Sequence, residues 1–75
     1  MVERIKEILA ELRPESDFSI SEDFIEEGLL DSLDIVALID TFEEEFGVVI
    51  PGTEVLPENF ASVPAIINLI KRHQS

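Results

Sequence analysis

Residues 28–51 read GLLDSLDIVALIDTFEEEFGVVIP and contain the longest amphipathic pattern of the chain. From Asp31 to Phe46 the large apolar side chains recur every three or four residues, which predicts a helix. Gly47 follows directly, and glycine is common where a helix ends in a left-handed residue. Asp31 is a good N-cap, and Asp34 in the first turn suits the positive end of the helix dipole. We therefore expect a helix that is capped at both ends.

The predicted helix has two different faces. A broad apolar stripe must face the core, and it consists of Ile35, Leu38, Ile39, Phe42 and Phe46. The opposite face combines apolar or small residues with acids, and it consists of Leu33, Val36, Ala37, Asp40, Glu43 and Glu44. Such a face suits the docking of a partner that offers apolar contacts and basic side chains. An ordinary solvated face is the alternative, because single exposed apolar residues are common.

The sequence before this helix predicts a first helix and a long loop. Residues 2–12 show helical spacing of apolar side chains, and Pro14 ends that pattern. Residues 15–31 are acidic and have no regular period, and a connection of this length in a small domain is often functional. The apolar residues expected to anchor this loop to the core are Phe18, Ile20, Phe24, Ile25, Leu29 and Leu30.

The sequence after the central helix predicts two further helical segments. Residues 48–50, VVI, are too short for a paired strand, so we expect a buried connection there. Residues 54–60 suit one short helical turn, and Ser62 is a plausible N-cap for a last helix. The core stripe expected for that helix consists of Val63, Ile66, Ile67 and Ile70. Residues 1–75 thus form a single all-α domain: a small four-helix bundle with three main helices, a long first loop and a short third helix.

The charge of the chain restricts its partners. Seventeen acidic and five basic residues give a net charge of −12. Each basic residue lies close to either the N-terminus or the C-terminus, so residues 14–70 contain none. A field of this sign repels nucleic acids and anionic bilayers and attracts proteins with basic patches. Simple solubility is the alternative explanation. There is no apolar run long enough to span a membrane and no signal segment, so we expect a cytoplasmic monomer.

Ser32 stands at the start of the central helix, where two interpretations compete. In the first, Ser32 only helps to start the helix. In the second, another enzyme modifies its hydroxyl, since a helix N-terminus favours the negative charge of a phosphate ester. Catalysis by the chain itself is not expected. The only histidine, His73, lies in the C-terminal tail, and neither a nucleophile elbow nor a metal-ligand cluster is present.

The motif D-S-L at a helix start, followed by the acidic cluster, the F-G turn and I-P, resembles the acyl and peptidyl carrier protein family. This resemblance implies that Ser32 carries 4′-phosphopantetheine, which a phosphopantetheinyl transferase installs from coenzyme A with Mg²⁺. It implies that the arm's thiol holds cargo as a thioester, so the cysteine-free chain is a carrier and not an enzyme. The residues it assigns to partner contacts are Asp31, Leu33, Asp34, Val36, Ala37, Asp40, Glu43 and Glu44.

The sequence does not decide which group the arm carries. Carriers of fatty acid synthesis usually have an acid where this chain has Ala37. The strings FIEEGLLDSL (24–33) and PENF (57–60) resemble stand-alone D-alanyl carriers, which receive an amino acid from an adenylating ligase. Acyl cargo supplied by a ligase or by acyltransferases with basic patches is the other reading. The competing class is an acidic protein-interaction module without a prosthetic group, in which Ser32 only helps to start a helix.

Overall fold

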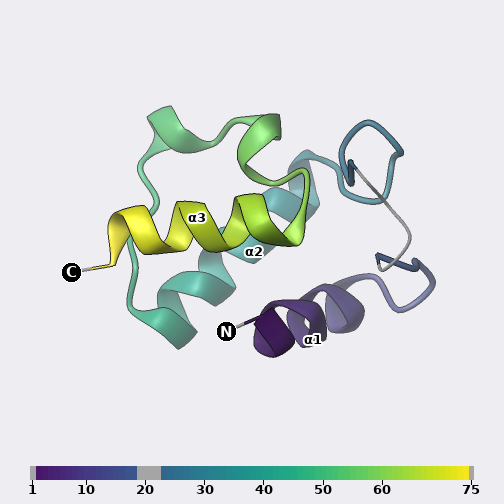
Figure 1. Ribbon diagram of the computed structural model, residues 1–75, viewed down its shortest axis with the longest axis horizontal. Coiled ribbons are helices and arrows are strands. Elements are labelled where there is room, and N and C mark those ends of the chain that lie inside the picture. The colour runs from purple at the N-terminus through teal and green to yellow at the C-terminus, as the bar shows by residue number, and fades with distance from the viewer. Residues whose placement is uncertain (1, 19–22, 75) are drawn as a thin grey trace.

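The computed structural model describes residues 2–18 and 23–74 and has the helical order that the sequence predicts (Figure 1). The elements are α1 (Val2–Leu12), α2 (Ser32–Phe46), the 3-10 helices η1 (Gly52–Glu54) and η2 (Pro57–Asn59), and α3 (Val63–His73). No strand occurs in the described part of the chain, so the all-helical prediction is confirmed. The first loop lies at the end of the molecule remote from the C-terminus (Figure 1).

α1 is held by a single apolar face. Ile5, Ile8 and Leu9 follow helical spacing and are buried, and the helix packs against α3. It ends at Leu12 because Pro14 has no N–H to donate and disfavours helical backbone in the residue before it.

α2 confirms the expected boundaries and caps. Asp31 is the N-cap, and Gly47 follows the last turn with a φ of 65° while its N–H donates to the Glu43 carbonyl over 3.1 Å. Only glycine adopts this left-handed conformation at little cost. Of the predicted core stripe, Ile35, Leu38 and Phe42 are buried, and Ile39 and Phe46 are partly buried against the core.

Phe24 anchors the first loop to the rest of the domain. Its N–H donates to the Ala61 carbonyl over 2.7 Å, and its ring meets Phe18 edge-on with centroids 5.0 Å apart. Its carbonyl accepts the N–H groups of Leu29 and Leu30 over 2.8 and 3.1 Å. Among the predicted anchors, Phe24 and Leu30 are buried, Phe18, Ile25 and Leu29 are partly buried, and Ile20 lies outside the described residues.

The connection after α2 differs from the prediction in detail. Residues 48–50 form no strand, as expected, but two 3-10 helices replace the single short turn. Pro57 explains the division, because it disfavours helical backbone at Leu56, which is extended with φ −119° and ψ 142°. The Asn59 side-chain amide donates to the Glu54 carbonyl over 2.8 Å and so ties η2 back to η1.

α3 begins as predicted and ends later than predicted. The Ser62 hydroxyl caps it by accepting the Ala65 N–H over 3.2 Å. Its buried stripe is Ile66, Leu69 and Ile70, with Val63 and Ile67 only partly buried, so Leu69 was missing from the predicted core. His73 is the last helical residue and is half-buried, which corrects its assignment to a tail.

The core contains buried side chains from the three α-helices, the first loop and the connection between α2 and α3. Its three fully buried phenylalanines come from the first loop, from α2 and from the residue after η2: Phe24, Phe42 and Phe60. Within the described residues, no helix is both long and apolar enough to cross a bilayer. The division into a single domain over 1–75 and the cytoplasmic location stay predictions.

Candidate functional site

Ser32 is the first residue of α2 and is exposed to solvent. Within the described residues its hydroxyl has no hydrogen-bond partner, so no contact has to be broken before it is modified. Capping is done by its neighbour. One oxygen of the Asp31 carboxylate accepts the N–H groups of Leu33 and Asp34 over 3.0 and 3.1 Å. Ser32 is therefore not needed as a cap, and the structural explanation for this serine loses its main support.

Asp34 completes a reciprocal capping box around Ser32. Its carboxylate accepts the Asp31 N–H over 3.0 Å, and Asp34 is only 8% exposed. The structure leaves little of Asp34 accessible, and its predicted contact with partners stays a prediction. Its carboxylate is turned into the fold and occupied there, so Asp34 has a structural role at the helix start.

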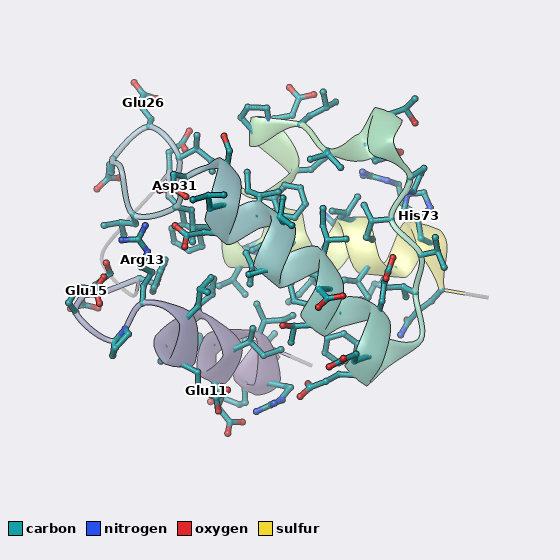
Figure 2. All side chains as sticks on the ribbon, turned by 180° about the vertical axis from the view of Figure 1, so that it is seen from behind. Glu11, Arg13, Glu15, Glu26, Asp31 and His73 are labelled. Atoms are coloured by element: carbon teal, nitrogen blue, oxygen red, sulfur yellow. The ribbon has the colours of Figure 1, made fainter. Side chains whose placement is uncertain are left out.

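Arg13 supports this turn from the end of α1, and sequence reasoning missed it. Its Nε and Nη2 donate to the two Asp34 carboxylate oxygens, the shortest contact being 2.6 Å, and Nη2 also donates to Asp31 Oδ2 over 3.3 Å. Nη1 reaches Glu15 over 3.4 Å. Figure 2 shows Arg13, Glu15 and Asp31 at the same end of the molecule. A lone arginine between the last helical residue and a proline was the only sequence signal.

The Arg13 contacts set the ionisation of the turn. Hydrogen bonds from Arg13 lower the pKa of Asp34, and this outweighs the partial burial of Asp34, which acts to raise it. In return, the hydrogen bond to Asp34 raises the pKa of Arg13 above its ordinary value. Both groups are thus held in their charged forms, as expected for a planar guanidinium facing a carboxylate.

The outer face of α2 is largely free for contact. Leu33 is 80% and Val36 is 64% exposed, so both apolar side chains are accessible to a partner. Asp40, Glu43 and Glu44 are exposed along the same face. We call the set Leu33, Val36, Asp40, Glu43 and Glu44 the outer face of α2. The described part of the first loop does not cover Leu33 or Val36.

Ala37 lies at the border of this face and not in its centre. It is half-buried and lines a depression of about 200 Å³ between α1 and α2, together with Ile8 and Leu12. Its carbonyl accepts the Thr41 hydroxyl over 2.9 Å. Any contact of Ala37 with a partner is therefore limited to the part of its side chain that remains accessible.

Among the described residues, the carboxylates next to the Ser32 hydroxyl are already engaged by other groups. Asp31 and Asp34, the adjacent carboxylates, are engaged by backbone amides and Arg13. His73 lies at the opposite end of the molecule (Figure 2), with Nε2 3.6 Å from a Glu54 carboxylate oxygen. No group of three potential metal ligands occurs in residues 2–18 and 23–74.

Comparisons with known proteins agree with this arrangement. Residues 3–70 match the family model described as phosphopantetheine attachment site. The chain is 37% identical over 73 residues to the acyl carrier protein of Clostridium acetobutylicum, covering 95% of this chain and 92% of that protein. It is 40% identical over 75 residues to the acyl carrier protein of Zymomonas mobilis, covering 97% and 94%. For the acyl carrier protein of Buchnera aphidicola the identity is 39% over 72 residues, covering 93% and 90%.

Proposed function

This chain belongs to the phosphopantetheine-binding carrier proteins, and we propose that Ser32 is the residue that carries its 4′-phosphopantetheine. The family assigns the chain a carrier role: it holds acyl groups as thioesters on that arm and has no catalytic activity of its own. One observation carries the choice of Ser32. Its hydroxyl is exposed, without a hydrogen-bond partner in the described structure, and stands at a helix N-terminus.

The residues around Ser32 fit the group. A phosphodiester at this position lies beside the first backbone amides of α2, where the helix dipole favours negative charge. The neighbouring Leu33 is 80% exposed and offers apolar surface next to the arm. When bound, the group supplies the thiol that this chain lacks, since no cysteine is present. The chain's own residues present the hydroxyl and give up its proton to a base of the transferase.

We assign partner contacts to the outer face of α2. Proteins of this family interact with a phosphopantetheinyl transferase and with acyl-processing enzymes. The exposed Leu33 and Val36 supply apolar contacts beside Ser32, and the acids Asp40, Glu43 and Glu44 follow along the helix. Charge steering gives fast association without tight binding, which suits a carrier that must leave each enzyme.

For the cargo, we favour an acyl group over an amino acid. The similar proteins of three bacteria are each named acyl carrier protein, which supports acyl cargo more than the short strings that resemble D-alanyl carriers. A loading assay distinguishes the two. The modified protein is offered a fatty-acyl ligase with ATP and a fatty acid, or an adenylating ligase with ATP and D-alanine. Loading by the second ligase alone would overturn the preference.

Intact mass spectrometry tests the attachment site. The protein is incubated with coenzyme A, Mg²⁺ and a broad-specificity phosphopantetheinyl transferase, alongside Ser32→Ala and the control Ser62→Ala at the start of α3. We expect one added phosphopantetheine in the parent and in Ser62→Ala, and none in Ser32→Ala, whose circular dichroism should match the parent because Asp31 still caps α2. A folded parent that gains nothing would favour the interaction module.

Modification kinetics test the outer face. Val36→Asp should slow modification, and the charge reversal Glu43→Lys with Glu44→Lys should weaken the encounter with a basic transferase. Val49→Asp is the matched control for the valine, since Val49 is 72% exposed but lies beyond α2. Glu3→Lys with Glu7→Lys on α1 is the matched control for net charge. Equal effects of the α2 variants and their controls would contradict the assignment.

A further inference from the structure

The turn around Ser32 concentrates negative charge and contains a hydroxyl that no hydrogen bond from the described residues holds in place. Asp31 and Asp34 place two carboxylates within two residues of the hydroxyl, and the proposed modification brings further negative charge to the same turn. The exposed hydroxyl has no hydrogen bond of its own to fix it within the described structure. Its position therefore depends on how firmly the first turn of α2 is held.

Arg13 is placed to neutralise this charge and to hold the turn in position. It contacts both oxygens of Asp34 and one oxygen of Asp31, and its Nη2 lies between the two carboxylates. In the described residues it is the one cation paired with either aspartate. Because Arg13 directly follows α1, its planar fork fixes the start of α2 relative to the end of α1.

Building on the proposed role of Ser32, we propose that Arg13 is a positioning residue for its modification. Arg13 holds the capping box in register so that the Ser32 hydroxyl meets the transferase in one orientation. It acts through Asp31 and Asp34 and lies outside the outer face of α2. Its loss should therefore lower the turnover number kcat of the transferase, while the Michaelis constant KM for the carrier, which reflects docking, stays unchanged.

The fold contains a matched control for this arginine. Arg4 is on α1 and, like Arg13, pairs with a carboxylate of α2, donating from Nε to Glu45 over 2.7 Å. That pair joins α1 to the last turn of α2, far along the helix from Ser32. Arg4→Gln removes the same charge and an equivalent contact between the helices, but it leaves the turn around Ser32 intact.

Steady-state kinetics of phosphopantetheine transfer test the proposal, with the folded fraction measured by circular dichroism. Arg13→Gln should lower kcat per folded molecule about tenfold with KM changed less than twofold, because small misplacements of a reacting group are costly. Arg13→Lys should recover only part of the loss, since an ammonium group cannot bridge both carboxylates. Arg4→Gln should match the parent.

A second variant keeps the test informative if Arg13→Gln folds poorly with Asp34 left unpaired. Arg13→Gln with Asp34→Asn removes both charges, so no buried charge is stranded, yet the bidentate contact is still lost. Reduced kcat at unchanged KM in this folded variant supports the proposal. Parental kcat in Arg13→Gln and in the double variant, or an equal loss in Arg4→Gln, overturns the proposal. The role of Ser32 still stands in that case, provided that the parent is modified. A parent that is not modified at all overturns both.

Discussion

The two ends of α2 are tied to α1 by the same kind of ion pair in different surroundings. At the start, Asp34 pairs with Arg13, its side chain is 11% exposed, and its carboxylate also accepts a backbone N–H. At the end, Glu45 pairs with Arg4, its side chain is 31% exposed, and no capping contact depends on it. Exposed pairs contribute little to stability, whereas a buried carboxylate with several donors is costly to disturb. The helix is thus held most firmly beside Ser32.

The largest expected difference between the two ends is in the free energy of unfolding. Asp34→Ala removes a capping contact and the partners of a charged group, and we expect it to lose about 2–3 kcal/mol. Glu45→Ala should leave the urea midpoint within experimental error of the parent. Urea titrations followed by circular dichroism measure both. Similar shifts for the two variants would remove the distinction between the ends.

The second largest expected effect is the pH dependence of the stabilisation that the Arg13–Asp34 pair gives to the start of α2. The pKa of Asp34 is depressed in the folded protein by Arg13, so this stabilisation is fully present above the unfolded pKa near 4. It is lost as the pH falls through the depressed folded value. The stability gap between the parent and Arg13→Gln should therefore be wide at pH 7 and close progressively below about pH 4. Urea midpoints at several pH values measure this gap, and a gap independent of pH would argue against the assignment.

A glycine substitution sharpens the comparison at the other end. Gly47 has a φ of 65°, and a Cβ there meets no atom within 4 Å, so Gly47→Ala should cost only the backbone strain, about 1 kcal/mol. Gly52→Ala is the control, because that glycine has open space and no left-handed φ. Thermal melts of both variants measure the difference. A Gly47→Ala variant as stable as the parent would contradict a left-handed conformation at Gly47.

Salt should produce the smallest effect. Added NaCl or Mg²⁺ screens the repulsion within a chain of net charge −12, so the melting temperature of the parent should rise. Salt also screens the exposed Arg4–Glu45 pair more than the partly buried Arg13–Asp34 pair. The difference in melting temperature between parent and Arg4→Gln should shrink with salt, and the difference for Arg13→Gln should persist. Calorimetry at low and high NaCl decides this.

Much of the fold follows from local pattern. The bounds of α2 were predictable because Asp31 and Gly47 carry the chemistry of a helix start and a helix end within the sequence itself. The outer face of α2 was predictable because helical spacing alone decides which residues oppose the core stripe. The division into two 3-10 helices depends on the extended backbone that Pro57 imposes on Leu56, which interrupts the helical turn expected there.

What the sequence did not reveal depends on contacts between distant residues. Asp34 carries the same charge as its exposed neighbours, and only its pairing with Arg13, 21 residues earlier, allows it to be buried. Arg13 had no helical pattern to identify it, because it lies just after α1. Leu69 differs from these two residues: it follows Ile66 by three positions, so helical spacing alone was enough to place it on the buried stripe of α3.

The Arg13–Asp34 contact also closes the first loop into a ring. Residues 14–30 connect its two ends, and within this stretch the Phe24 N–H donates to the Ala61 carbonyl while the Phe24 carbonyl accepts the Leu30 N–H. In hydrogen-exchange terms, the amides of Asp31, Leu33 and Asp34, which the capping box binds, should therefore open together with the loop and not fray as a separate helix end. Concerted exchange of these amides with those of the described loop residues would mark the turn around Ser32 and that part of the loop as one cooperative unit.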